Sequence, residues 1–279
     1  MTALTLQLRA SFAFVERNFN LIKRYWAWEM VWLIYSTAES LSVSFIGLGM
    51  GAISGNGAAA PQVNTGYLVL YLLIGTLVWR FLSMIFYWIT DLINIERWEG
   101  TIEYTLMAPV RRLTHMAGQT VFAVVYSLFF TGIILTVTTL VFKIDLSRAN
   151  IPGGVAMILS GSISFIGIGI MASSLPLLFP ERGAQMTNVF IALLMLVSGV
   201  YYPVSVLPGF LRQLAVYSPA TYVLEGVRLA MLENVPTHEL WGFMRPVLLI
   251  GVFLVPAGLW VFAQAERYAK RTGKLHRNG

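Results

Sequence analysis

Six long apolar runs, separated by short polar segments, set the pattern of this 279-residue chain. They cover residues 26–50, 67–90, 118–142, 153–175, 184–201 and 243–265, and runs of about 20 residues suit helices that cross a hydrocarbon layer. The pattern therefore predicts an all-α polytopic membrane protein, with one six-span transmembrane domain over residues 26–266.

The segment before the first run has a helical period of its own. Its apolar stripe repeats at spacings of four, three, four and three: Leu8, Phe12, Val15, Phe19 and Ile22. Charged residues lie off that stripe, which predicts an amphipathic helix over residues 4–24 in the plane of the membrane interface. Residues 1–25 are thus expected to be a cytoplasmic interfacial segment, and residues 267–279 a basic cytoplasmic tail.

Residues 95–112, between the second and third runs, combine charge with a helical pattern. Four apolar residues share one stripe: Ile95, Trp98, Ile102 and Leu106. Three acidic residues share the adjacent face: Glu96, Glu99 and Glu103. Gly100 weakens the middle, and Pro109 ends a helix expected over about 95–108. A helix lying on lipid is one interpretation, but acidic groups are unfavourable beside an anionic leaflet, so a protein partner fits better.

Residues 202–240 are too polar to form a span, yet they contain more apolar and aromatic residues than an ordinary loop. Pro203, Pro208 and Pro219 divide the segment, and we expect short helices over about 209–217 and 219–233. Pro208 and Pro219 suit a first helical position, and Ser218 suits an N-cap. The segment is expected to be re-entrant in the outer half of the membrane, protected by the spans.

Small residues four apart predict close helix crossings. Ala156, Ser160 and Ser164 form such a ladder in the fourth run. Gly47 and Gly51 form another at the end of the first, although they can equally be loop glycines.

Two charges lie deep within predicted spans. Glu39 is near the middle of the first span and Arg80 slightly past the middle of the second. An unpaired charge there costs at least about 2.5–3.5 kcal/mol, so the two residues are expected to pair or to face a shared polar cavity. The alternative is that each reaches an interface by snorkelling.

Composition and charge agree with a membrane protein. Hydrophobic residues make up 57% of the chain and charged residues 11%, where soluble domains have nearer 25%. The net charge of +6 does not indicate nucleic-acid binding, because the basic residues gather at membrane boundaries. Thirteen of them fall on the side of both termini and the 95–108 helix and five on the other, which predicts that this side is cytoplasmic. Cysteine is absent, which excludes disulfide and thiol chemistry.

No motif of an enzyme or a nucleotide-binding protein fits its context. The chain lacks a phosphate-binding G-x-x-x-x-G-K-[ST] sequence, and a G-x-G-x-x-A match at 167–172 lies inside a span. The three histidines are far apart, so neither a metal site nor a catalytic base is expected.

Two motifs and the span layout resemble the permease subunits of type-2 ABC exporters. ERWEGTIEYTLMAPVRR at 96–112 is similar to the first cytoplasmic loop of that family. The stretch 198–228, which ends in SPATYVLEGVR, is similar to the segment after its fifth span. The amphipathic N-terminal helix is the third shared feature.

The resemblance implies a dimer of like or unlike permeases with two copies of a separate ATP-binding subunit, which would use ATP and Mg²⁺; this chain would bind no cofactor. The coupling helix that contacts that subunit would contain Glu96, Arg97, Trp98, Glu99, Gly100, Thr101, Ile102, Glu103, Leu106 and Pro109. The outer gate would contain Tyr201, Tyr202, Pro203, Pro208, Tyr217, Pro219, Tyr222, Glu225 and Arg228. The implied location is a bacterial or archaeal plasma membrane.

Aromatic residues near the outer half favour an amphipathic drug-like or lipid-like substrate, with polysaccharide export as the alternative. An ion-driven secondary transporter would need ion ligands at the midplane, where only Glu39 and Arg80 qualify. An intramembrane enzyme or a channel is a weaker alternative, because no convergent catalytic groups are evident and the coupling-type helix argues against a channel.

Overall fold

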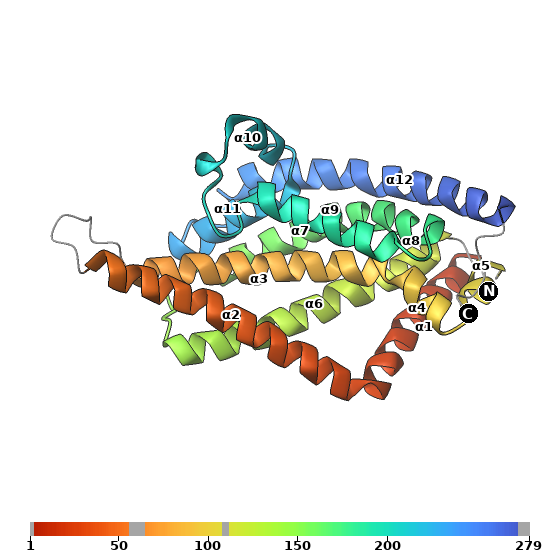
Figure 1. Ribbon diagram of the computed structural model, residues 1–279, viewed down its shortest axis with the longest axis horizontal. Helices are drawn as coiled ribbons and strands as arrows, with labels where there is room; N and C mark the ends of the chain where they lie inside the picture. The colour runs from red at the N-terminus through yellow and green to blue at the C-terminus, as the bar shows by residue number, and fades with distance from the viewer. Residues whose placement is uncertain (1–2, 56–64, 108–111, 273–279) are drawn as a thin grey trace.

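The computed structural model describes residues 3–55, 65–107 and 112–272, and all regular structure in these ranges is helical. Six helices run along the length of the molecule (Figure 1): α2 (Trp26–Gly55), α3 (Thr65–Thr90), α6 (Arg112–Phe142), α7 (Ile151–Ala172), α9 (Gly183–Ser198) and α12 (Trp241–Arg271). The short α8 (Ser174–Leu178) continues α7 after Ser173. The structure confirms the all-α class.

The other helices lie toward the two ends of this bundle (Figure 1). At one end lie α1 (Ala3–Arg24), α4 (Leu92–Trp98), α5 (Ile102–Met107) and the C-terminal end of α12. Toward the opposite end lies α10 (Gly209–Ala215), followed in the chain by α11 (Pro219–Leu232).

Five helical segments of the described chain are long and apolar enough to cross a membrane: Trp26–Gly51, Thr65–Thr90, Leu113–Phe142, Ile151–Leu178 and Trp241–Arg271. This confirms a polytopic membrane protein. The expected fifth span, α9, has 16 residues and falls short of the other five. A count of six spans therefore stays a prediction.

Helix α3 forms the centre of the bundle. It packs against α2, α6, α7 and α11, and most of its side chains are buried, including Phe81, Leu82, Ile85 and Phe86 with no exposed surface. Because α3 carries Arg80 in its middle and leads directly into α4, it connects this charge to the short helices α4 and α5.

Small residues let neighbouring helices approach closely, as predicted. On α7, Ser164 Oγ donates to the Val247 carbonyl of α12 (2.6 Å), and a Cβ at Gly167 would lie 2.6 Å from Leu254 backbone. On α2, a Cβ at Gly47 would lie 3.0 Å from Val69 Cα of α3. Gly51 lies just as close to Thr65, so both glycines belong to a helix crossing and not to a loop.

The single helix expected over 95–108 is two helices, because Gly100 ends the first. Gly100 adopts φ +71°, and the Thr101 N–H bonds back to the Glu96 carbonyl (2.8 Å). This six-to-one bond around a left-handed glycine is a Schellman C-cap, in which glycine has no steric penalty. The apolar stripe of the two halves is therefore not continuous.

The two helices expected within 202–240 are confirmed as α10 and α11, with Pro219 at the start of α11. Pro208 stands one position before α10 and not in its first turn. Ser218 occupies the N-cap position of α11, but its side chain makes no capping bond. Its Oγ lies 2.7 Å from Ser198 Oγ instead, which joins the start of α11 to the end of α9.

Asp91 lies between α3 and α4, and its buried carboxyl makes the stability of the protein depend on pH. Burial raises the pKa of its carboxyl, against a smaller opposing effect of the hydrogen bond from Asn94 Nδ2 (3.0 Å). A raised pKa means that folding disfavours the charged form, so Asp91→Asn is expected to raise the melting temperature at pH 7. The gain in melting temperature should shrink as the pH falls through the pKa of Asp91 in the folded protein. It should vanish below the pKa of Asp91 in the unfolded chain, because the carboxyl of the parent protein is then neutral in both states.

The control is Asp145→Asn, because the Ser147 backbone N–H lowers the pKa of that exposed carboxyl. It should give no gain at pH 7. Melting curves of the detergent-solubilised protein between pH 3 and pH 8 measure both variants. A pH-independent gain for Asp91→Asn would contradict a raised pKa of the Asp91 carboxyl.

Candidate functional site

The site begins where α1 lies against α6. The Ser11 carbonyl oxygen would be 2.5 Å from a Cβ at Gly118 of α6, so the two backbones nearly touch there. Asn18 Nδ2 donates to Gln119 Oε1, and the rings of Phe14 and His115 are 4.6 Å apart. One side of α1 is thus fixed to the bundle by polar and aromatic contacts.

The apolar stripe of α1 faces away from these contacts. Leu8, Phe12 and Phe19 are 62%, 69% and 55% exposed. Large apolar side chains arranged in this way on a helix beside a membrane bundle are typical of an interfacial helix, which buries them in lipid.

Arg17 connects α1 to the turn between α4 and α5. Its Nη2 donates to Glu99 Oε2 (2.8 Å) and to Thr101 Oγ1 (3.1 Å), and its Nη1 donates to Glu96 Oε1 (3.3 Å). The guanidinium thus joins residues about 80 positions apart in sequence. We name this set of residues, together with His115, the Arg17 junction.

Glu96 is the buried member of the Arg17 junction. Its side chain is fully buried, and His115 Nε2 lies 3.2 Å from its Oε1. A buried carboxylate is costly unless it is paired, so Glu96 requires Arg17. Its carboxylate is therefore not available to a partner surface, contrary to the sequence-based expectation, and Glu99 is also engaged within the chain.

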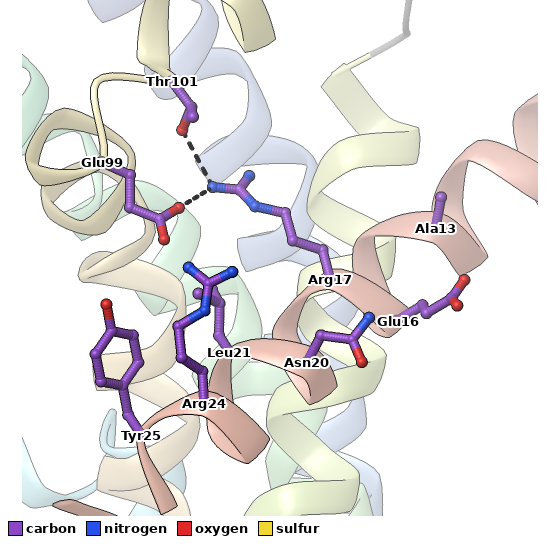
Figure 2. A pocket seen from close by; sticks show the side chains of 9 residues that line it. All are labelled: Ala13, Glu16, Arg17, Asn20, Leu21, Arg24, Tyr25, Glu99 and Thr101. Carbon is purple, nitrogen blue, oxygen red and sulfur yellow. Dashed lines mark hydrogen bonds and ion pairs between the residues drawn. The ribbon is translucent and has the colours of Figure 1, made fainter.

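An open pocket of about 700 Å³ lies beside the Arg17 junction, between α1 and the α4–α5 turn (Figure 2). Its lining comes from these two regions: Ala13, Glu16, Arg17, Asn20, Leu21, Arg24, Tyr25, Glu99 and Thr101. Figure 2 shows the Arg24 side chain extending toward Glu99, yet Arg24 forms no ion pair with any residue that the structure describes. The pocket is therefore polar and open to a partner at this end of the bundle.

Helix α5 presents apolar side chains outward. Tyr104 is 79% exposed and Met107 is 84% exposed. Sequence reasoning missed both, although they are three apart in the predicted coupling helix and share a face. Within that helix, the side chains of Arg97, Trp98, Ile102, Glu103 and Leu106 and the whole of Pro109 lie outside the described residues.

Arg228 organises the predicted outer-gate region. It is 8% exposed, and its Nη1 and Nη2 donate to the carbonyls of Gly199 (3.0 Å) and Val200 (2.6 Å). Its guanidinium also stacks 3.7 Å from the Tyr71 ring centroid. Arg228 thereby fastens α11 to the turn that follows α9.

The other predicted gate residues lie around this turn. Tyr202 Oη donates to the Leu196 carbonyl, Tyr222 Oη donates to the Val216 carbonyl (2.9 Å), and Tyr217 is 79% exposed. Tyr201 is partly buried, Glu225 is exposed, and Pro203 precedes a single turn of 3₁₀ helix at Val204–Val206.

Glu39 and Arg80 form the predicted intramembrane pair. Arg80 Nη1 lies 3.5 Å from Glu39 Oε2, a long single contact between α2 and α3. The Glu39 side chain is 43% exposed and that of Arg80 is 17% exposed, so the carboxylate is the more accessible charge.

Comparison with known proteins agrees with this architecture. Residues 13–232 match the family described as "ABC-2 type transporter". The chain is 25% identical over 164 residues to the linearmycin resistance permease protein LnrN of Bacillus subtilis, which covers 58% of this chain and 42% of that protein. It is 24% identical over 157 residues to the probable multidrug ABC transporter permease YbhR of Escherichia coli, which covers 56% of this chain and 42% of that protein. The chain thus aligns with about two-fifths of the length of each relative. Since the family match covers most of the sequence, this chain belongs to the ABC-2 type transporter family of membrane permeases.

Proposed function

We propose that this chain is the transmembrane permease subunit of an ATP-driven ABC exporter, and that a separate ATP-binding subunit docks on the end formed by α1, α4 and α5. The Arg17 junction carries the proposal. One guanidinium holds α1, the end of α4 and the start of α5 together. A displacement of α5 therefore moves α1 and the first turns of α6 with it.

The docking surface combines exposed apolar groups with charge. Tyr104 and Met107 supply apolar anchors on α5, and buried aromatic anchors commonly dominate such interfaces. Trp98, Ile102 and Leu106 remain further candidates for this role, and Glu103 for charge complementarity. Glu96 and Glu99 act inside the chain, where they fix the turn that carries α5.

The proposed assembly contains two permeases, like or unlike, and two ATP-binding subunits that use ATP and Mg²⁺. Both termini would be cytoplasmic in a bacterial or archaeal plasma membrane; α1 and the end of α12 lie together with α4 and α5 (Figure 1). Helix α9, extended by the residues that Arg228 fastens, would complete a sixth span. Helices α10 and α11 would form the outer gate.

The proposed substrate is an amphipathic drug-like or lipid-like molecule. The names of the two relatives, a linearmycin resistance permease and a probable multidrug permease, support this class. The exposed aromatic residues of α2 and of the outer segment, such as Trp32 and Tyr217, also suit an amphiphile.

Gentle extraction from the native membrane tests the class of function. We expect an ATP-binding subunit to accompany the chain at about equal stoichiometry, with hydrolysis that depends on the chain. If no ATPase accompanies it and the purified chain moves solute under an ion gradient, the chain is a secondary transporter and the proposal fails.

Substitutions at the docking surface test the coupling role. Tyr104→Ala, Trp98→Ala and Glu103→Lys are each expected to weaken binding of the ATP-binding subunit about tenfold, or to uncouple hydrolysis from transport, while the permease still folds. Phe253→Ala is the control, because Phe253 is 78% exposed on α12, away from this end. Binding and transport-coupled hydrolysis in proteoliposomes measure the effect. Full coupled activity in all three variants would count against the surface.

A further inference from the structure

One exposed face of α2 carries aromatic rings that lead to the intramembrane carboxylate. Trp28, Trp32, Tyr35 and Glu39 follow each other at spacings of four, three and four, so they share one side of the helix. The three aromatic residues are 61%, 45% and 58% exposed. We name these four residues the α2 stripe.

The rings of the α2 stripe are ordered relative to each other. Trp28 and Trp32 have centroids 6.0 Å apart at an interplanar angle of 84°, and Trp32 and Tyr35 have centroids 5.9 Å apart at 85°. These edge-to-face pairs hold the side chains in one arrangement and leave ring surface accessible.

An interfacial aromatic belt does not account for the whole stripe. Trp28 lies close to the start of α2, where such belts occur. Glu39 is 13 residues beyond Trp26, which is roughly 20 Å along a helix that rises about 1.5 Å per residue. The stripe therefore runs from the interface deep into the membrane and ends at a charge.

A neighbouring side of α2, and not the one that carries the stripe, packs against α3. Ser36, Ser40 and Ser44 have no exposed surface, and they lie on the side that continues to Gly47 against α3. The three rings of the α2 stripe are thus not needed to hold α2 in the bundle, and the exposed groups of the stripe are available to a ligand.

The chemistry of the stripe favours a cation over an anion. Glu39 is 43% exposed, whereas Arg80 is 17% exposed behind it, and only Glu39 Oε2 is paired with Arg80. Ring faces carry partial negative charge and attract cations. Both the accessible carboxylate and the rings therefore present negative potential outward.

We propose that the α2 stripe is a binding site for lipophilic organic cations: the rings contact the apolar body and Glu39 faces the positive charge. This proposal rests on the proposed exporter function, and it adds that the exported amphiphiles are positively charged. A second copy of this chain covering the stripe is the competing occupant.

Equilibrium binding of radiolabelled tetraphenylphosphonium to the purified, detergent-solubilised chain tests the site, with protein-free micelles subtracted. We expect saturable binding of one cation per chain. Tetraphenylborate has the same shape and the opposite charge, and it should not compete. No saturable binding, or equal binding of both ions, would overturn the proposal and would favour a covered stripe or simple partition.

Two variants with matched controls assign the site. Glu39→Gln should weaken tetraphenylphosphonium binding about tenfold, and Glu181→Gln, at an exposed turn, should leave it unchanged. Because Glu39→Gln leaves Arg80 without its partner, Trp32→Leu is the second variant; it keeps both charges and should weaken binding about fivefold. Trp260→Leu, at a 66% exposed tryptophan of α12, is its control. Unchanged affinity in both site variants would sink the assignment.

This assay needs neither ATP nor a partner subunit. Its failure would leave the exporter proposal to stand on the co-purified ATPase, and failure to find an ATPase would leave the cation affinity measurable. The two outcomes are therefore separable.

Discussion

Replacing Arg17 with methionine is expected to destabilise the Arg17 junction by about 3–5 kcal/mol, because it leaves the buried Glu96 carboxylate without its guanidinium partner. Methionine keeps much of the apolar stem, so the loss isolates the charge. Amide hydrogen exchange in detergent should show α1 exchanging faster than in the parent protein, since the junction is one of its main attachments. Coupling to the ATP-binding subunit should fall with it.

The double variant Arg17→Met with Glu96→Gln separates charge from packing. It should recover a large part of the lost stability, because no buried charge remains. Arg24→Met is the control on the same helix and the same pocket, since Arg24 has no ion pair among the described residues (Figure 2). Equal exchange of α1 in the Arg17 and Arg24 variants would show that the ion pairs do not hold α1.

Replacing Gly75 with alanine is expected to disrupt the contact between α3 and the turn after α9. A Cβ at Gly75 would lie 2.1 Å from the Val200 carbonyl oxygen and 3.0 Å from Arg228 Nη2. That carbonyl accepts the shortest Arg228 bond, so moving it also leaves a buried guanidinium without an acceptor. The expected cost is about 3 kcal/mol, measured as a lower melting temperature of the solubilised protein.

Gly132→Ala is the matched control for Gly75→Ala. It is a glycine within the span α6 with no atom within 4 Å of an added Cβ. The same substitution should be neutral there or stabilise the helix by up to about 1 kcal/mol. Similar melting temperatures for the two variants would mean that the turn after α9 shifts without cost. The bonds of Arg228 to Gly199 and Val200 would then not be what holds α11 to this turn.

Periodicity and hydropathy predicted the long helices of this protein, although the ends of α2, α6 and α12 lie five or six residues beyond the predicted ones, and α8 was not predicted. The depth argument predicted the contact of Glu39 with Arg80. These succeeded because each depends on local pattern or on the cost of a charge in lipid. The same pattern failed at Gly100. Residues 95–108 have the period of one helix, and only the backbone shows that Gly100 takes a left-handed conformation and ends α4.

The Arg17 junction could not be found from sequence, since Arg17 lies 79 to 84 positions before Glu96, Glu99 and Thr101 and each of these residues has an ordinary surface role when considered alone. Arg17 lies off the apolar stripe of α1 like any solvated charge. Glu96 has the spacing of an exposed acidic face but is buried by the packing of α1 and α6. The signal was an excess of acid beside an anionic leaflet, which indicated a partner without saying that the partner was in the same chain.

The outward-facing apolar stripe of α1 has a consequence for biogenesis. During synthesis α1 leaves the ribosome long before Glu96, His115 and Gln119 exist to hold it. Its exposed Leu8, Phe12 and Phe19 allow it to bind the bilayer surface as an interfacial helix, without being inserted as a transmembrane span. When α4 and α6 arrive, the free polar side of α1 receives them, and Glu96 acquires its counter-ion as it becomes buried. Because Arg17 is translated before Glu96, the guanidinium is already present when the carboxylate that needs it becomes buried.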